Sequence, residues 1–208
     1  MTELKPTVFI VDDDPGVLDS LKFLMRSVGL TAEIYQSARE FLGAFEVDRP
    51  GCLVLDVRMP EMSGLELQER LKSMESILPI IFITAHGDIP MAVQAVKAGA
   101  VDFIQKPFRD QDLIDKVQAA LQQDAELRQQ LADRADINER IESLTPRELE
   151  VMDLVVEGKP NKAIAHSLGI SQRTVEIHRA RVMEKMQAES VPQLVQMVIM
   201  SGRQANEP

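Results

Sequence analysis

CLVLD, at residues 52–56, is an apolar run that ends in an aspartate. Four more short runs rich in β-branched and aromatic residues accompany it, separated by longer helical patterns; they occupy residues 7–11, 32–35, 80–84 and 102–105. Three of the five runs, at 7–11, 52–56 and 80–84, do not alternate between apolar and polar residues, which is typical of strands covered by helices on both faces. We therefore predict an α/β domain with a doubly wound, five-stranded parallel sheet.

The chain has 208 residues, of which 45% are apolar and 27% are charged. This composition is sufficient for a buried core, and the length favours two small domains. No apolar run approaches the roughly 18 residues of a membrane span, and the first residues lack the pattern of a secretory signal, so we expect a cytoplasmic protein with no membrane partner. The single cysteine, Cys52, cannot form an internal disulfide, and we expect it to be buried and reduced.

The net charge of −10 is unevenly distributed. The acidic excess lies in residues 1–142, whereas residues 143–208 carry equal numbers of acidic and basic side chains. Within this last part, residues 171–186 are locally basic. The two parts of the chain are therefore expected to have different tasks, and the local charge keeps nucleic acid among the possible partners of the second.

Residues 122–142 contain neither glycine nor proline and are rich in helix-forming residues. We predict a helical linker here, which can also continue the helix before it. A broken apolar stripe fits a paired coiled coil and a single solvated helix equally well; it consists of Leu121, Leu127, Leu131, Ile137 and Ile141.

The last third carries only helical patterns. Thr145, with a proline at the next position and Glu148 three residues on, fits a capping box, and Gly158 and Pro160 end that helix. A helix at 161–168 and a longer one to Met186 are joined by the turn Gly169-Ile170-Ser171, as in a helix-turn-helix motif. A final helix is expected around 192–200. We thus predict domains at 1–122 and 143–208, joined by a linker at 123–142.

Polar residues stand where four of the predicted strands end: Asp12-Asp13-Asp14, Asp56, Thr84 and Lys106. The carboxyl ends of parallel strands meet at one edge of the sheet, where ligands of such folds bind. Converging carboxylates repel each other unless a divalent cation lies between them, and oxygen ligands suit Mg²⁺. With that metal, one carboxylate can attack a phosphoryl group while a lysine neutralises the charge of its oxygens.

These residues, together with Arg58-Met59-Pro60 after Asp56 and the segment Phe103 to Phe108, resemble the receiver domain of two-component response regulators over residues 6–122. The resemblance implies a flavodoxin-like fold, with Asp56 as the phosphoacceptor and Lys106 as the partner of the phosphoryl oxygens. It further implies that the Thr84 hydroxyl follows the phosphoryl group, that Phe103 turns inward as a switch, and that the Lys106–Pro107 peptide is cis. The implied Mg²⁺ ligands are Asp12, Asp13, Asp56 and the backbone carbonyl of Arg58.

Simpler structural roles compete with several of these assignments. Asp14, before a proline, is a more typical helix cap than a ligand. Phe103 can be a core residue. His86 can tune the lifetime of the phosphate or be an ordinary loop residue, and His166 is expected to be structural.

Residues 144–201 resemble the four-helix DNA-binding domain of the LuxR and NarL class, and the combination with this receiver resembles FixJ-type regulators. In that class the third helix, here 171–186, enters the major groove. Glu176 can accept a hydrogen bond from a cytosine amine or repel wrong sites. The side chains expected to reach phosphates or bases are Arg173, Thr174, Ile177, His178, Arg179, Arg181 and Lys185.

The resemblance implies a switch in which a sensor histidine kinase phosphorylates Asp56 and the receiver then pairs with a second copy. The expected partners are that kinase, promoter double-stranded DNA, RNA polymerase and, on phosphorylation, a homodimer. We expect the unphosphorylated receiver to mask the C-terminal domain. The pairing surface is predicted at Met91, Val93, Val96, Lys97 and Asp102.

Two other classes of function compete with this interpretation. A phosphatase of the haloacid-dehalogenase type would also use Asp56 as a nucleophile, but it carries a second aspartate where this chain has Arg58. A receiver whose helical tail binds protein or RNA is the other. We expect a regulator that is not a turnover enzyme.

Overall fold

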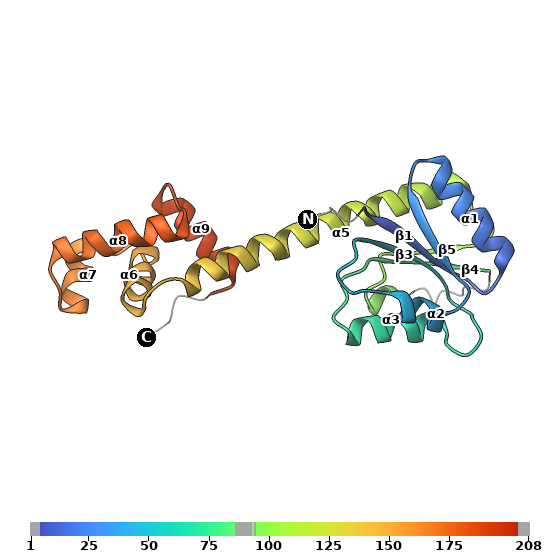
Figure 1. The fold of residues 1–208 in the computed structure, drawn as a ribbon, viewed down its shortest axis with the longest axis horizontal. Coiled ribbons are helices and arrows are strands. Elements are labelled where there is room, and N and C mark those ends of the chain that lie inside the picture. Colours follow the sequence, from blue (N-terminus) through green and yellow to red (C-terminus); the bar gives the residue numbers. More distant parts are fainter. Residues whose placement is uncertain (1–4, 86–92, 94, 204–208) are drawn as a thin grey trace. The chain divides into compact units, whose positions relative to one another are not determined.

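The computed structural model describes residues 5–85, 93 and 95–203, and the chain divides into two compact units, Met1–Arg128 and Gln129–Pro208 (Figure 1). A five-stranded sheet in the order β2-β1-β3-β4-β5, parallel throughout, forms the centre of the first unit. The prediction of a doubly wound α/β domain is thereby confirmed. The strands are β1 (Thr7–Val11), β2 (Thr31–Tyr35), β3 (Gly51–Asp56), β4 (Ile80–Thr84) and β5 (Asp102–Gln105).

Helices cover both faces of this sheet. The helix α1 (Pro15–Ser27) and the N-terminal part of α5 (Asp110–Glu142) lie on one face, and α2 (Ala38–Ala44) and α3 (Gly64–Ser73) lie on the other (Figure 1). Every residue of β1, β3 and β4 is buried, which explains why these strands lack alternation. Between β4 and β5, residues 93 and 95–97 are helical, and residues 86–92 and 94 lie outside the described residues.

Capping residues mark where the helices α2 and α3 begin. Ser63 and Glu66 form a complete capping box at α3. Ser37 caps α2, although the Glu40 carboxylate accepts from the Gln36 amide instead of from the cap residue. Cys52 is a free, buried thiol whose pKa burial raises to about 12, as expected for a structural cysteine.

The predicted linker is the C-terminal part of α5, a continuous 33-residue helix. Its apolar stripe is divided between the two units. Leu121 packs against the core of the first unit, whereas Ile137 and Ile141 are buried in the core of the second. Leu131, between them, is exposed. Pairing of this helix with a second copy stays a prediction.

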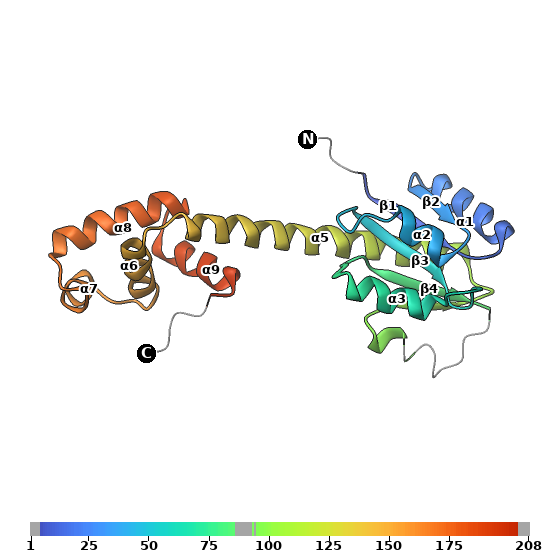
Figure 2. The same cartoon turned by 60° about the horizontal axis from the view of Figure 1, so that its bottom comes forward.

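The second unit consists of helices around one apolar core (Figure 2). α6 contacts each of the three helices that follow it. Gly169 ends α7 in the left-handed conformation, with φ of 65°, as the predicted turn requires. Along the described residues, no helix is long and apolar enough to cross a lipid bilayer. The helices are α6 (Pro146–Val156), α7 (Asn161–Leu168), α8 (Gln172–Met186) and α9 (Val191–Ser201).

Candidate acidic site and nucleic-acid interface

The sheet brings the polar strand-end residues together at one edge. Asp12 directly follows β1, Asp56 and Thr84 are the last residues of β3 and β4, and Lys106 directly follows β5. The first three are 2%, 7% and 1% exposed, respectively. They line a cleft of about 270 Å³ together with Asp13, which is exposed. This convergence follows from the parallel topology, because all five strands end at the same edge.

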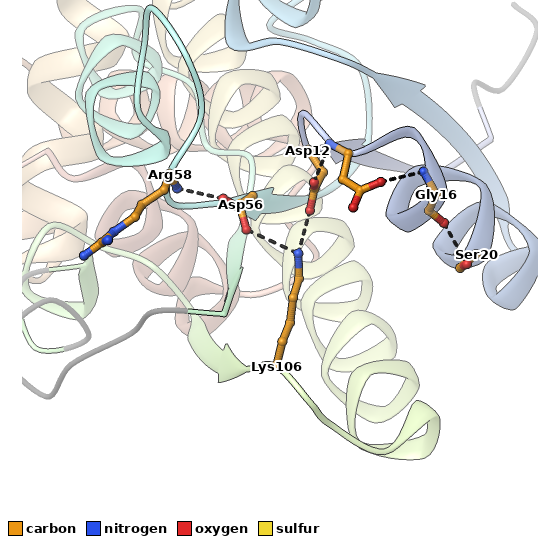
Figure 3. Close-up of polar contacts among 7 residues, drawn as sticks. Asp12, Gly16, Ser20, Asp56, Arg58 and Lys106 are labelled. Atoms are coloured by element: carbon orange, nitrogen blue, oxygen red, sulfur yellow. Dashed lines mark hydrogen bonds and ion pairs between the residues drawn. The ribbon is translucent and has the colours of Figure 1, made fainter.

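Lys106 joins the two buried carboxylates (Figure 3). Its Nζ lies 2.7 Å from Asp12 Oδ2 and 3.3 Å from Asp56 Oδ1. The other oxygens accept from backbone amides, Asp56 Oδ2 from Arg58 at 2.7 Å and Asp12 Oδ1 from Asp14 at 2.9 Å. Both carboxylates are therefore held in fixed orientations that face the lysine.

One ammonium group shared by two buried carboxylates leaves surplus negative charge. Burial raises the pKa of Asp56, and the nearby Asp12 charge adds to this, while the Arg58 amide and Lys106 act in the opposite direction. Burial by itself would lower the pKa of Lys106, but the hydrogen bond and charge of Asp12, reinforced by Asp56, outweigh it and raise that pKa. An additional cation would therefore be stabilised at this edge.

The donor set fits Mg²⁺. This ion takes one or two protein carboxylates and keeps several waters, so it does not need an all-protein cage. In residues 5–85, 93 and 95–203, no group of three or more His, Cys, Asp or Glu side chains is arranged as a metal cluster. Asp12 and Asp56 supply oriented oxygens, and Asp13 and Arg58 line the same cleft.

The other residues predicted at this edge differ in their contacts. The Thr84 carbonyl accepts from the Lys106 amide at 2.8 Å, and the Lys106–Pro107 peptide is cis, as expected. Phe103 is half-buried and packs against Phe82, with ring centroids 6.5 Å apart. The Asp14 carboxylate accepts from the Gly16 amide at 2.8 Å and caps α1, which confirms its role as a cap. His86 lies outside the described residues.

The predicted recognition helix, α8, presents an exposed stripe. Arg173, Ile177 and Arg181 follow one another at four-residue spacing and are exposed, with 47% of Ile177 accessible. Val175, Val182 and Met186 on the other side of the helix are buried in the core. An apolar side chain between two arginines is the composition of a surface that can contact phosphates and base edges together.

Two other predicted α8 residues, Thr174 and Arg179, form hydrogen bonds within the unit. Thr174 shares a hydrogen bond of 2.8 Å with the Ser171 hydroxyl. The Arg179 guanidinium donates to the Asn161 side-chain oxygen on α7 at 2.8 Å. His178 is half-buried, and its Nδ1 has no hydrogen-bond partner among the described residues. The first contact stabilises the first turn of α8, and the second joins the middle of α8 to the beginning of α7.

Lys185 lies at the end of α8, in a contact that sequence reasoning missed. Its Nζ donates to Glu148 Oε2 at 2.7 Å and to the Ser143 carbonyl at 2.9 Å. Glu148 also accepts from the Thr145 amide and is 2% exposed. The capping-box pattern was the signal for Glu148, but nothing local in the sequence pointed to its lysine partner.

Fold and site together define a receiver domain followed by a helix-turn-helix domain, and comparisons with known proteins agree. Residues 8–118 match the family model of the response regulator receiver domain, and residues 142–198 match that of bacterial regulatory proteins of the luxR family. The chain belongs to the response regulators that join a receiver to a LuxR-type DNA-binding domain, and it is a transcriptional regulator of two-component signalling.

Relatives match over most of their length. The chain is 49% identical to the transcriptional regulatory protein FixJ of Rhizobium meliloti over 94% of this chain and 96% of the relative. It is 46% identical to the response regulator protein TodT of Pseudomonas putida over 94% and 86%, respectively. Among solved structures, the response regulator StyR aligns with a TM-score of 0.86 at 47% identity, over 94% of this chain and 98% of StyR. Full-length FixJ from B. japonicum aligns with a TM-score of 0.60 at 42% identity, over 96% and 98%.

Proposed function

We propose that Asp56 accepts a phosphoryl group from a sensor histidine kinase and that phosphorylation controls DNA binding by α8. The observation that carries this proposal is the oriented, buried pair of Asp12 and Asp56 sharing Lys106 at the carboxyl edge of the sheet. We propose a receiver at residues 1–122, a helical linker at 123–142 and a DNA-binding domain at 143–208. Such a regulator acts in the cytoplasm, where its DNA is.

In the transfer, an Asp56 carboxylate oxygen attacks phosphorus, and the bond between phosphorus and the kinase histidine nitrogen breaks. Lys106, already 3.3 Å from Asp56 Oδ1, pairs with a phosphoryl oxygen. Asp12, Asp13, Asp56 and the Arg58 carbonyl would hold Mg²⁺, which supplies further positive charge to the phosphoryl oxygens. The Thr84 hydroxyl then binds the phosphoryl group, and Phe103 turns inward.

A larger cleft, of about 960 Å³, lies beside the acidic site and fits a docking site for the kinase. Asp14, Lys106 and Pro107 line the end nearest the acceptor, and α1 forms one wall. The Phe23 ring on this wall is exposed, and a kinase segment bound in the cleft would bury it. Such a segment would lie next to Lys106, which contacts Asp56.

We further propose that phosphorylation pairs two receivers. Val93 and Val96, from the predicted pairing surface, are exposed apolar side chains next to the exposed Lys97. Asp102 forms an ion pair with Lys116, and Met91 lies outside the described residues. Pairing would present two α8 helices to two half-sites of a promoter, where the regulator would also contact RNA polymerase.

On DNA, the exposed α8 stripe would make the base-reading contacts. Ile177 suits a thymine methyl group, and Arg173 and Arg181 suit phosphates or guanine. Thr174, His178 and Arg179 lie at the edge of this surface. Because the Lys185 ammonium is bound to Glu148, we assign it to the stability of the domain rather than to DNA.

Intact mass tests the acceptor chemistry. After incubation with Mg²⁺ and a small phosphodonor, the protein should gain one phosphoryl group, and Asp56→Asn should gain none. A mobility-shift titration with promoter DNA should then show tighter binding by the phosphorylated chain. Equal gain in the Asp56→Asn variant would refute the assignment. Sustained turnover of a phosphomonoester would favour the phosphatase instead.

A further inference from the structure

A second buried ion pair of the receiver lies at the amino end of β3, opposite the end that carries Asp56. Asp124 on α5 is 2% exposed, and its carboxylate accepts from Arg128 Nε at 2.9 Å and from the Gly51 amide at 2.9 Å. Gly51 is the first residue of β3, whose last residue is Asp56. The carboxylate thus ties the helix to the beginning of the strand that carries the proposed phosphoacceptor.

Arg128 completes the attachment. Its two terminal nitrogens donate to the backbone carbonyls of Asp48 at 3.1 Å and Arg49 at 2.9 Å, in the loop before β3. All three guanidinium nitrogens are therefore bound, which uses the planar fork that only arginine provides. We call Asp124 and Arg128, with these contacts to residues 48–51, the clamp.

Packing around the clamp leaves little freedom for movement. A Cβ atom at Gly51 would lie 2.0 Å from the Thr7 carbonyl oxygen, so the backbone of β3 approaches that of β1 too closely for any side chain. Arg49 in turn forms an ion pair with Glu33 on β2 and lies 4.9 Å from the centre of the Phe9 ring. The loop that the clamp binds is therefore itself held by the sheet.

The clamp differs from the other acid–base pairs of the same helix. Asp136 and Arg140 have the same four-residue spacing, but the Asp136 side chain is 55% exposed and accepts from no backbone amide among the described residues, and Arg140 reaches only one distant carbonyl, that of Met186. Exposed pairs of this kind contribute little to stability. Asp124 and Arg128 instead join residues that are 73 to 80 positions apart.

We propose that Asp124 and Arg128 are positioning residues that attach the first turns of the linker helix to the receiver and that the response to phosphorylation depends on them. Beyond Arg128 the helix continues to Glu142 and buries Ile137 and Ile141 in the second unit. If the helix frayed at residue 122, the DNA-binding unit would be insulated from changes in the receiver. The inference rests on the proposed function.

The test compares full-length Arg128→Gln and Asp124→Asn with the matched control Asp136→Asn. Each protein is titrated with promoter DNA before and after phosphorylation, and phosphoryl incorporation is measured by intact mass. We expect the two clamp variants to lose at least about fivefold of the affinity gain on phosphorylation, which is the lower range of allosteric coupling. Incorporation at Asp56 should not change.

Hydrogen exchange separates coupling from stability. In the clamp variants, the Gly51 amide and residues 124–135 should exchange faster, whereas the core of β3 and β4 should stay protected. Arg128→Lys, which keeps the charge and loses the fork, should behave like Arg128→Gln. An unchanged affinity gain together with faster exchange would overturn the proposal, and so would unchanged exchange. If unmodified protein took up no phosphoryl group, the proposed function would fail, while the exchange data would still decide whether the clamp holds the helix.

Discussion

Two lysine–carboxylate pairs in this chain have almost the same geometry and different consequences. Lys106 lies 2.7 Å from Asp12 in the receiver, and Lys185 lies 2.7 Å from Glu148 in the DNA-binding unit. Each carboxylate side chain is nearly inaccessible, at 2% and 3%. The difference is that Lys185 has one carboxylate partner, whereas Lys106 also serves Asp56.

The balance of charge differs between the two sites. The Lys185 ammonium, together with the Thr145 amide, lowers the pKa of Glu148 to about 2, so this carboxylate is stabilised in its charged form. At the other site, burial raises the pKa of Asp56 and the negative charge exceeds the positive. The satisfied pair holds two segments together, whereas the unsatisfied one fits the proposed binding of a cation and a phosphoryl group.

Of the changes considered, removal of Lys106 should have the largest effect, and it should act on the rate of phosphorylation. Lys106→Ala is expected to slow phosphorylation of Asp56 by about 100-fold, because the transferred group loses a positioned positive charge. The rate of mass gain with a small phosphodonor measures this. Lys185→Ala is the control and should leave the rate unchanged. A normal rate in Lys106→Ala would mean that the lysine is not needed in the transfer.

Breaking the satisfied pair should cost stability and leave phosphorylation intact. Glu148→Gln is expected to destabilise the DNA-binding unit by about 2 kcal/mol, since it weakens charge-assisted hydrogen bonds to a nearly inaccessible group. Hydrogen exchange of α6 to α9 in the full chain reports this unit separately. Glu66→Gln changes the same position of the exposed capping box at α3 and should have a smaller effect. If both variants were destabilised equally, the ion pair with Lys185 would not contribute to stability.

Acid should weaken the same pair. The pKa of Glu148 is lower in the folded state than its ordinary value of 4.5, so its contribution to stability is fully present above that value and is lost as the pH falls towards about 2. Exchange rates in the DNA-binding unit should therefore rise over this range more steeply in the unmodified protein than in Glu148→Gln. Parallel curves would contradict the assignment.

Glu176 is a third carboxylate, exposed and without an ion-pair partner among the described residues, and its removal should give the smallest change, a shift in DNA affinity. It lies on α8, with Arg173 and Arg179 three positions away on either side. Glu176→Ala should tighten binding to random DNA a few-fold, because a charge that repels phosphate is removed, and reduce the preference for promoter DNA. Competition titrations with both DNAs measure the ratio. Glu189→Ala, outside α8, is the control, and an unchanged ratio would show that Glu176 reads no base.

Much of the fold was predictable because its signals are local. Each predicted strand agrees with the structure to within one residue, and Thr145, Gly158 and Gly169 delimit their helices as expected. The acidic edge was also predictable, since parallel strands end together and their last residues must meet. The roles assigned there to Asp56 and Thr84 rest on the family resemblance, and the Asp56→Asn variant tests the first of them.

Sequence reasoning does not find contacts between side chains that are distant along the chain. It predicts Lys185 as a DNA contact because the residue is basic and lies on the recognition helix, and it does not find the ion pair of this lysine with Glu148. It likewise does not find the contacts of Asp124 and Arg128 with the loop before β3, whose residues lie more than 70 positions earlier in the chain. Neither set of contacts has a local signal in the sequence. Asp124 with Arg128, for example, looks like an ordinary helical i, i+4 pair.

The sequence by itself determined the order of the helices and strands, and through parallel topology it determined which polar residues share an edge. Only the tertiary structure decided which charges are buried, which cation serves two carboxylates, and which basic residues stay available for DNA. The physical reason is that helix caps and strand patterns depend on neighbours along the chain, whereas burial and ion pairing depend on residues brought together from far apart.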